Sequence, residues 1–337
     1  MTTGADPARR PRVTVVTAAY NAEAFLAATL LRVRTQTFAD FEHLVFDDGS
    51  RDGTADVVRR LMADDPRLRL IGQTNRGLAA TRNEGIRAAR GEFVAFLDHD
   101  DAWHPEKLSS QVAALDAHPE AGVASCYSAV IAPDGTQLGW RLGGDANGDV
   151  YWQMLEWDAV SGGSVPLCRR TTLERAGFFD ETLPMRSDWD MWIRLAHLAP
   201  FVTVPRTLVG YARSPASASR QYARFAAAGV AILDRAARAD ARITPGFHRF
   251  CRARDTFAVA CVCAIDDQLG LAWRYLGQSL ATTPLAVLRA PRRWAMVAVL
   301  VLKTMLPAPV FARVFGLLSR WRFGLRTDRA FDAPALV

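Results

Sequence analysis

The sequence predicts an α/β fold, in which a mostly parallel sheet is covered by helices on both faces and is followed by a helical C-terminal region. Three observations support this prediction. Between residues 12 and 97, short apolar runs alternate with segments whose apolar residues recur at helical spacing, an order typical of parallel sheets. Acidic residues directly follow two of the apolar runs. After residue 217, nearly every segment has helical spacing.

The first half is expected to contain four strands joined by three helices. The strands are predicted at residues 13–17, 43–46, 68–71 and 93–97, where β-branched and other apolar residues follow one another. The helices are predicted around residues 25–33, 57–62 and 78–89, and Asp52 or Thr54 is the candidate N-cap of the second. Ligands of such sheets bind beyond the carboxyl ends of the strands, so we expect the site at that edge.

The second half mixes both element types. Helices are predicted at residues 107–117, 151–157 and 188–198, and strands at residues 123–131, 165–168 and 201–211. Pro133–Thr136 has the composition of a turn, so a hairpin is expected there. We therefore divide the chain into a lead-in at residues 1–11, an α/β domain at residues 12–216 and a helical region at residues 217–337.

Composition favours a cytoplasmic globular protein. The chain has 337 residues, half of them hydrophobic, which is enough for one large core or two moderate ones. The five cysteines are scattered without zinc-site spacing and are expected to be reduced thiols. Residues 1–11 are polar and contain two prolines, so they resemble a disordered lead-in more than a signal peptide.

The positive charge is concentrated near the C-terminus. The formal net charge is +6, and residues 285–330 are rich in arginine with few carboxylates. Such a region could meet nucleic acid or an anionic membrane. Apolar and tryptophan neighbours, without a nucleic-acid reader motif, make nucleic acid the weaker alternative.

Residues 287–326 are the candidate for membrane association. Their longest uninterrupted apolar run, Ala295–Leu302, is far short of the roughly 20 residues that a membrane-spanning helix needs. Arginines flank this segment on both sides, which also argues against spanning. We expect interfacial helices on the anionic inner leaflet; the alternative is a helical layer that packs on the α/β domain.

A carboxylate cluster ends the fourth predicted strand. Five apolar residues, Phe93–Leu97, are followed directly by Asp98, His99, Asp100 and Asp101. Repulsion in such a cluster is relieved by solvent or by a cation, and hard carboxylate oxygens suit Mg²⁺ or Mn²⁺. The alternative is a solvated acidic loop. Because Thr17 and the pair Asp47–Asp48 also follow strand ends, one crevice could hold all of these side chains.

Taken in order, these motifs resemble the family 2 glycosyltransferases, which have the Rossmann-like GT-A fold. The resemblance runs from Val13 to Ser219. The matching segments are Val15–Asn21, Gln36–Phe38, Asp47–Thr54, Asn75–Asn83, Gly91–Phe93, Asp98–Pro105, Gly177–Glu181 and Ser187–Trp192. As a set, in this order and spacing, they are specific to the family.

The resemblance implies a nucleotide diphosphate sugar as donor. The residues implied to bind it are Thr17, Tyr20, Asp47, Asp48, Arg82 and Asp98. Asp48, with Asp47 beside it, would accept the N–H of the base, whereas Thr17 and Tyr20 would contact base or ribose. Read alone, residues 47–50 could equally be an ordinary turn, and Arg82 could be a solvated helix residue.

The resemblance also implies Mg²⁺ or Mn²⁺ at the carboxylate cluster. Asp100 would be the direct ligand, with Asp98 near the ribose or reached through water, and the cation would neutralise the diphosphate. Asp101 is the less certain member and could cap the next turn.

Asp188 matches the catalytic base of the family. A carboxylate there would take the proton of the acceptor hydroxyl as it attacks, which inverts the anomeric centre. Without the resemblance, an Asp that opens a helix would be read as an N-cap or dipole partner. Two positions depart from the family pattern: Ser187 stands where Glu is usual, and Arg213 stands in a segment that usually holds a histidine, where it could offset the missing charge.

The sequence therefore predicts a metal-dependent inverting glycosyltransferase. Its acceptor would be a glycan or a lipid-linked sugar in the synthesis of surface polysaccharide or glycolipid, at the inner face of the cell membrane. One alternative is a nucleotidyltransferase, although the glycine-rich phosphate loop with a basic residue is missing after the first strand. The other is a non-catalytic protein of the same fold that binds nucleotide sugars, against which the intact Asp48, Asp100 and Asp188 argue.

Overall fold

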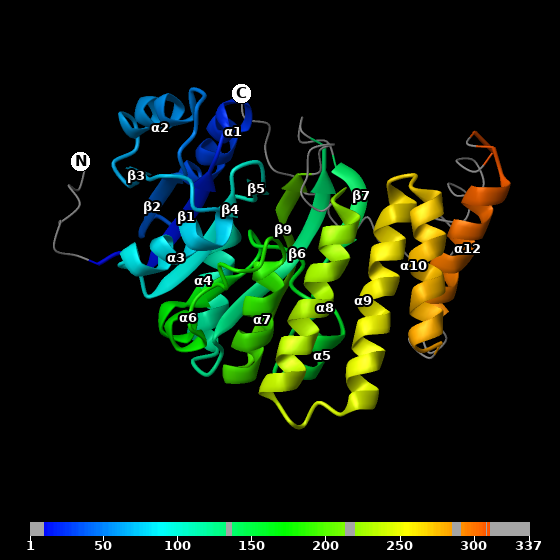
Figure 1. The fold of residues 1–337 in the computed structure, drawn as a ribbon. Coiled ribbons are helices and arrows are strands. Elements are labelled where there is room, and N and C mark those ends of the chain that lie inside the picture. Colours follow the sequence, from blue (N-terminus) through cyan, green and yellow to red (C-terminus); the bar gives the residue numbers. More distant parts are fainter. Residues whose placement is uncertain (1–9, 133–136, 213–219, 285–290, 308, 311–337) are drawn as a thin grey trace.

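The computed structural model describes residues 10–132, 137–212, 220–284, 291–307 and 309–310. One twisted sheet with helices on both faces makes up most of it, and a row of long helices stands beside the sheet (Figure 1). The predicted α/β fold with a helical C-terminal region is confirmed. Of the predicted lead-in at residues 1–11, residues 1–9 lie outside the described part.

The first half of the sheet is parallel, as predicted. It contains β1 (Val13–Ala19), β2 (Phe41–Asp47), β3 (Leu68–Gly72) and β4 (Phe93–Asp98) in the order β3-β2-β1-β4. The connecting helices are α1 (Glu23–Arg34), α2 (Thr54–Met62) and α3 (Leu78–Ala88). Parallel neighbours require such crossovers, so the alternation of patterns was enough to predict this half.

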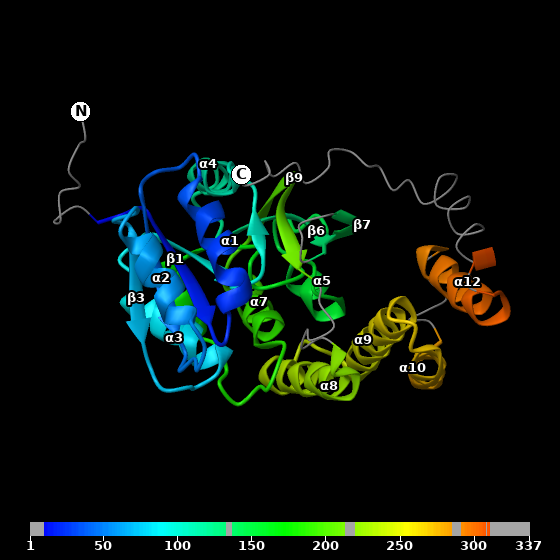
Figure 2. The same cartoon turned by 90° about the horizontal axis from the view of Figure 1, so that it is seen from above.

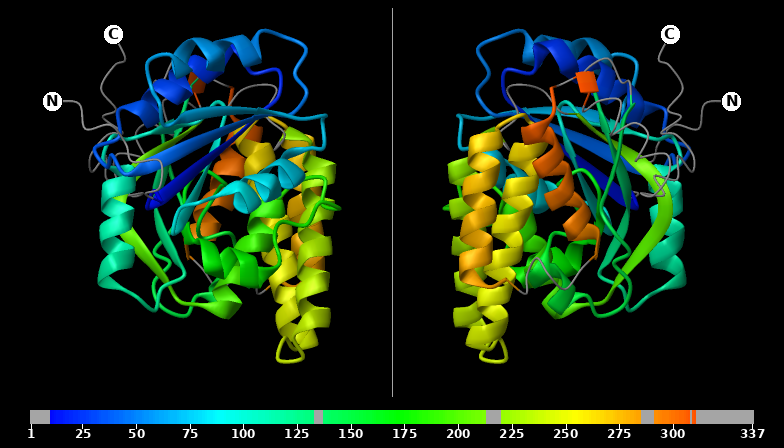
Figure 3. Two further views of the ribbon diagram at one scale, coloured as in Figure 1. Left: turned by 90° about the vertical axis from the view of Figure 1, so that its left-hand side faces the viewer. Right: turned by 90° about the vertical axis from the view of Figure 1, so that its right-hand side faces the viewer.

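Helices cover both faces of this half (Figure 3). Leu26 and Leu30 of α1 and Val57 of α2 pack on one face, together with Val45 of β2. On the other face α3 lies close to β1: a Cβ added at Gly85 would come within 2.3 Å of a Val16 methyl group. Strand β4 is buried from Phe93 to Leu97. Burial of each such side chain stabilises the fold by about 1.5–3 kcal/mol.

The second half of the sheet is mixed, which the sequence did not reveal. Beyond β4 follow β8 (Leu167–Arg169), β6 (Val123–Ile131), β9 (Phe201–Ala212) and β5 (Ala102–Trp103), while β7 (Gln137–Leu142) pairs with β6. Of these pairs only β6 with β9 is parallel. The predicted hairpin is confirmed by β6 and β7, although its turn at residues 133–136 lies outside the described residues.

Several helices surround the second half. They are α4 (Lys107–Ala117), α5 (Tyr151–Glu156), α6 (Arg170–Ala176) and α7 (Ser187–Leu198). The sequence analysis missed α6 and the two-residue β5, both of which are too short to show a period. Trp189 and Trp192 of α7 are buried in the main core, so this helix is fixed by its aromatic face.

The C-terminal region forms a helical layer. Its helices are α8 (Tyr222–Ala239), α9 (Pro245–Ile265), α10 (Leu269–Thr282) and α12 (Pro291–Met305), and they follow one another away from the sheet (Figures 1 and 2). Thr244 caps α9 by accepting a hydrogen bond from Phe247 N at 3.2 Å. The arrangement resembles a stack in which each helix packs on the one before.

The near and far ends of this layer have different cores. Leu233 of α8 and Cys251 of α9 belong to the main core of the α/β domain. Farther out, Phe257, Leu276 and Leu300 form a separate cluster. The first two helices therefore pack on the domain, whereas the alternatives for residues 287–326 stay predictions. No helix within the described ranges combines the length and apolar character needed to span a membrane.

The cysteines are thiols. No disulfide joins any of the five, all of which the structure describes; Cys261 is half-buried and the other four are buried. This agrees with the prediction that they do not form disulfides.

Candidate active site

The acidic segments meet at one edge of the sheet. The strand register places Ala19 opposite Asp47 and Ala18 opposite Asp98. In addition, Asp48 N donates a hydrogen bond to Ala19 O at 2.9 Å. The carboxyl ends of β1, β2 and β4 thus bring the predicted donor residues together, as expected for a doubly wound sheet.

Asp48 organises the loop that precedes α3. Its carboxylate is buried; Oδ1 accepts hydrogen bonds from Arg76 N and Gln73 Nε2, both at 2.8 Å, and Oδ2 accepts one from Gly77 N at 2.9 Å. Asp47 is half-buried and accepts a hydrogen bond from Ser50 N at 2.9 Å. These bonds are more than an ordinary turn requires. A contact between Asp48 and a base stays a prediction.

Arg82 and Asp98 form an ion pair at the centre of the site. Arg82 Nη2 lies 2.6 Å from Asp98 Oδ1, with the arginine side chain 3% exposed and the aspartate 27%. The guanidinium also lies over the rings of Phe96 and Phe179, at 5.9 and 5.5 Å from their centroids. Arg82 is therefore not a solvated helix residue. Buried this way, it holds Asp98 in place and leaves positive charge beside the carboxylate cluster.

The two predicted contacts on β1 differ in exposure. Tyr20 is 44% exposed just beyond the strand. Thr17 is fully buried, and its Oγ1 lies 2.9 Å from Nε2 of His43. Burial lowers the pKa of His43 to about 3, so this histidine is neutral. Thr17 is thus covered in this structure, with its hydroxyl against His43 of β2, and its contact with base or ribose stays a prediction.

The three carboxylates of residues 98–101 lie in different surroundings. Thr29 of α1 anchors the segment, with Oγ1 at 3.0 Å from His99 O and 3.1 Å from Asp101 O. Asp101 is buried and accepts a hydrogen bond from Ala212 N at 2.9 Å. Asp98 is paired with Arg82. Asp100 is half-buried and, among the side chains that the structure describes, has no arginine or lysine ion-pair partner.

The charges of this segment call for a cation. Burial, and then the neighbouring carboxylate of Asp98, raise the pKa of Asp100; the same two causes raise that of Asp101 further. A divalent cation would relieve this repulsion, and Asp100 offers it a hard oxygen ligand, so the residues present fit Mg²⁺ or Mn²⁺. Within the described ranges, no group of three His, Cys, Asp or Glu side chains is arranged to hold a metal.

Asp188 lies in the first turn of α7. It is half-buried, and its Oδ1 accepts a hydrogen bond from Trp189 N at 2.9 Å. The N-cap position belongs to Arg186, whose φ is 59°. Asp188 is therefore not the N-cap that its sequence position suggested, although its charge still favours the N-terminal end of the helix dipole.

A second carboxylate lies near Asp188, and the sequence analysis missed it. Asp158 follows α5 and accepts hydrogen bonds from Val160 N at 3.1 Å and Ser161 N at 2.9 Å. Burial, and then the charge of Asp188, raise its pKa to about 7. In the sequence, this carboxylate could have been suspected only because Ser161 and two glycines follow Asp158 closely. That composition is equally typical of an ordinary turn.

The segment from Asp158 to Ser164 links the two ends of the site. Ser164 Oγ accepts a hydrogen bond from Asp98 N, and its carbonyl accepts one from Trp103 Nε1, both at 2.9 Å. A Cβ added at Gly163 would come within 2.2 Å of Arg82 Nη2, so a side chain there would displace the guanidinium that pairs with Asp98. One short segment thus contacts the donor residues at its end and lies near Asp188 at its start.

Of the two residues that depart from the family pattern, the structure describes one. Ser187 is buried at the start of α7. Arg213 lies outside the described residues, so its suggested compensating charge stays a prediction.

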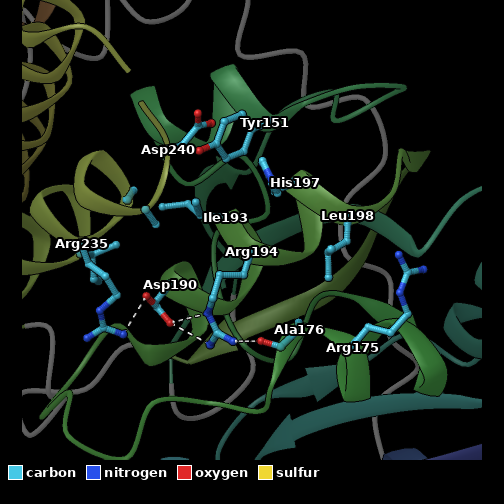
Figure 4. Close-up of a pocket in the computed structure, with 13 residues that line it drawn as sticks. Tyr151, Arg175, Ala176, Asp190, Ile193, Arg194, His197, Leu198, Arg235 and Asp240 are labelled. Carbon is cyan, nitrogen blue, oxygen red and sulfur yellow. Dashed lines mark hydrogen bonds and ion pairs between the residues drawn. The ribbon is translucent and has the colours of Figure 1, made fainter. Parts of the chain in front are cut away.

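A pocket on another side of α7 has no part in this site. It has a volume of about 240 Å³ and is lined by residues of α5, α6, α7 and α8 (Figure 4). At its wall, Asp190 accepts hydrogen bonds from Arg194 at 2.8 and 3.0 Å and from Arg235 of α8 at 3.3 Å. The charge of Asp190 is thus neutralised by two arginines that also link neighbouring helices.

Comparison with known proteins agrees with this geometry. The family model of glycosyl transferase family 2 matches residues 14–155. A putative glycosyltransferase of Bacillus subtilis, EpsH, is 42% identical over 96 residues, which are 28% of this chain and 28% of that protein. The putative teichuronic acid biosynthesis glycosyltransferase TuaG of the same organism is 35% identical over 130 residues, 38% of this chain and 51% of the relative. The chain thus aligns with about half or less of these relatives.

Solved structures show the same fold. A mannosyltransferase from Pyrobaculum calidifontis, PcManGT, in complex with GDP-Man and Mn²⁺, has a TM-score of 0.58 at 22% identity, covering 94% of this chain and 89% of that one. TarS 1–349 of S. aureus in complex with UDP-GlcNAc has a TM-score of 0.57 at 17% identity, covering 87% of each chain. Together with the family match, these likenesses show that the chain has the GT-A fold and that residues 14–155 are similar to glycosyl transferase family 2.

Proposed function

We propose that the protein is an inverting, metal-dependent glycosyltransferase, which moves a sugar from a nucleotide diphosphate sugar to a glycan or lipid-linked acceptor. The observation that carries this proposal is the link through residues 158–164 between the Arg82–Asp98 pair and the surroundings of Asp188. One end of the site has the charges that a nucleotide diphosphate needs, and the other has a carboxylate that can accept a proton.

The donor would lie across the ends of β1, β2 and β4. Tyr20 offers an exposed ring to base or ribose, and Asp47 and Asp48 lie at the adjacent strand end. Asp98 lies nearer the ribose and diphosphate, with Arg82 behind it. The bound UDP-GlcNAc of TarS and GDP-Man of PcManGT, which have the same fold, support this class of donor.

Asp100 would hold Mg²⁺ or Mn²⁺, and Asp98 would reach the ion only indirectly because Arg82 already occupies it. When bound, the cation supplies positive charge for the leaving diphosphate. Few protein ligands are needed, since such ions keep waters and phosphate oxygens in their coordination shell. The Mn²⁺ found with GDP-Man in PcManGT supports this assignment.

Asp188 would act as the general base. Its carboxylate accepts the proton of the acceptor hydroxyl while the hydroxyl oxygen forms a bond to the anomeric carbon. The bond from that carbon to the diphosphate breaks on the opposite side, and its electron pair leaves with the nucleoside diphosphate. Attack opposite the leaving group inverts the anomeric configuration.

Relatives suggest the biological setting. TuaG is named for teichuronic acid biosynthesis, and chondroitin synthase of Escherichia coli is 25% identical over 199 residues, which are 57% of this chain and 28% of that protein. Both names denote polysaccharide synthesis. A surface polysaccharide or glycolipid acceptor is therefore our proposal for this chain.

The outer helices would bring the enzyme to the inner face of the cell membrane. Trp273 of α10 and Trp294 and Met305 of α12 are 39%, 50% and 76% exposed, and large apolar side chains at the protein surface favour interfacial binding. Flotation of the full chain with vesicles tests this. We expect binding to phosphatidylglycerol vesicles that weakens with salt, and an absence of binding would contradict the proposal.

A panel of nucleotide diphosphate sugars tests the main proposal. In the presence of Mn²⁺, at least one donor should release its nucleoside diphosphate, slowly to water and faster to an added membrane or glycan extract. EDTA should stop the release. Release of pyrophosphate from a nucleoside triphosphate would instead indicate a nucleotidyltransferase, and tight binding without any turnover would indicate a binding protein.

A further inference from the structure

Helix α7 begins with an unusual residue two positions before Asp188. Arg186 has φ 59° and ψ 22°, the left-handed region that residues other than glycine rarely occupy. Its carbonyl accepts a hydrogen bond from Asp190 N at 3.3 Å. The backbone of Arg186 therefore sets the direction in which the first turn of α7, with Asp188, leaves the preceding loop.

A buried ion pair with α9 holds Arg186 in this conformation. Nη1 and Nη2 of Arg186 donate to the two carboxylate oxygens of Asp255 at 3.0 and 2.7 Å. The side chains are only 9% and 8% exposed. Two parallel charge-assisted bonds fix the guanidinium plane as well as its distance, so a helix about 70 positions further along the chain determines where Arg186 lies.

Aromatic rings of α7 and α8 enclose the guanidinium of Arg186. Its carbon lies 4.3 Å from the ring centroid of Trp189 in α7 and 4.2 Å from that of Phe225 in α8. Nη1 also lies 3.3 Å from the carbonyl of Phe225. Trp189 directly follows Asp188 and donates its backbone N–H to it. The stack therefore holds the residues on both sides of the base.

Helix α8 leaves space for the pair. A Cβ added at Gly229 would lie 2.0 Å from Asp255 Oδ2 and 2.3 Å from Arg186 Nη1. Glycine weakens a helix interior compared with alanine, so its presence here matches the space that the ion pair requires.

A second pair joins α8 to α7 one turn further along. Arg235 of α8 contacts Asp190 at 3.3 Å (Figure 4) and also pairs with Asp180. The figures show α8 and α9 side by side next to α7 (Figures 1 and 2). The C-terminal layer thus contacts α7 on two sides of the position that Asp188 occupies.

We propose that α8 and α9 position the general base of the α/β domain, and that Arg186, through Asp255, is the positioning residue for Asp188. This inference rests on the proposed function, in which Asp188 is the base. The pair also commits the charge of Arg186 to Asp255, so that among the described side chains the Asp188 carboxylate has no ion-pair partner and remains available for proton transfer. The C-terminal layer is then part of the catalytic framework.

The test compares two ion pairs of the same helical layer. Asp255→Asn breaks the pair with Arg186. Asp266→Asn breaks the pair of Asp266 with Arg220, which has an N–O distance of 3.0 Å and a carboxylate that is 3% exposed, at the far end of α9. The readouts are kcat for the release of nucleoside diphosphate from the active donor of the panel to water, with Mn²⁺, and the dissociation constant of that donor.

We expect Asp255→Asn to lower kcat by about 10- to 100-fold, because a small displacement of a catalytic group has effects of that size. Donor affinity should stay within about twofold, since the donor residues lie elsewhere. Asp266→Asn should keep both values. Asp255→Glu, which retains the charge, should recover part of kcat. In the Asp188→Asn background, Asp255→Asn should lower the remaining rate little further, as residues that act through one another are not additive.

If Asp255→Asn does not fold, Arg186→Lys replaces it, because lysine keeps the charge but loses the two parallel bonds. A wild-type kcat in either variant overturns the inference, and so does a loss that Asp266→Asn shares or that falls equally on donor affinity. A wild-type chain that hydrolyses no donor of the panel would overturn the proposed function itself and this inference with it.

Discussion

The two ends of the site are built in different ways. The donor end consists of residues that directly follow β1, β2 and β4, so neighbouring strands bring them together automatically. The base end assembles Asp158, Arg186, Asp188 and Asp255 from three separate segments. Local motifs therefore suffice for binding a nucleotide, whereas placing the base requires long-range packing that includes the C-terminal helices.

The largest expected effect is a loss of sugar transfer without a loss of donor binding, which distinguishes the base end from the donor end. Asp188→Asn should lower the rate of sugar transfer by about 10³-fold, because it removes the general base while retaining the shape of the side chain. Donor affinity should not change. Steady-state rates and calorimetric titration of the donor measure both. A variant that retained wild-type transfer would show that Asp188 is not the base.

A substitution at the donor end should instead weaken the binding of the nucleotide. Asp100→Ala should weaken Mn²⁺-dependent binding of the nucleoside diphosphate by about 100-fold, since a bound cation contributes several kcal/mol at a diphosphate. Titration of the nucleotide with and without Mn²⁺ measures this. Asp101→Asn is the matched control, because Asp101 is buried against Ala212 N and is not expected to contact the ion. Equal losses in both variants would argue against Asp100 as the ligand.

The Arg82–Asp98 pair should contribute to stability as well as to binding. Arg82→Met leaves Asp98 without its partner in a partly buried place, so the free energy of unfolding should fall by about 2 kcal/mol. On the same helix, Arg87→Met removes an exposed pair with Glu84 and should change it by less than about 0.5 kcal/mol. Urea unfolding compares them; similar losses would mean that burial of the Arg82 pair has no special role.

The sequence predicted the donor end better than the base end for a physical reason. Apolar runs and acidic strand ends are local patterns, and the βα alternation fixes how they meet. The structure brings Asp48, Arg82 and Asp98 to one edge of the sheet as expected, and their contacts with a donor stay predictions. Thr17 differs from these residues. It lies in a strand that is buried at every position, so the sequence does not indicate which of its side chains face a ligand.

At the base end, Asp188 was found only through a family resemblance. Nothing local distinguishes Asp158 or Asp255 from ordinary loop and helix acids, because Asp188, which raises the pKa of Asp158, and Arg186, which pairs with Asp255, lie tens of residues away in the chain. Strand β5 was missed because it is only two residues long, and the antiparallel pairing of β8, whose strand was predicted, depends on distant residues in the same way.

A pH dependence of stability should also come from Asp158 at the base end. Its pKa in the folded protein is about 7, and about 3.9 is usual for an unfolded chain. Between those values the folded state binds more protons, so the free energy of unfolding should fall as pH rises from about 4 to about 7 and then level off. Asp158→Asn should remove this contribution and stabilise the fold at pH 8. Urea unfolding at several pH values measures the slope, and an unchanged slope would contradict the assignment.

The stereochemistry of donor hydrolysis tests the central claim most directly. Proton NMR can follow the sugar that the wild-type enzyme first releases from the active donor, before the anomers equilibrate in water. Attack by a hydroxyl activated at Asp188, opposite a diphosphate held near Asp100, predicts that the first anomer has the configuration opposite to that of the donor. First release of the anomer with the donor's own configuration would contradict the account.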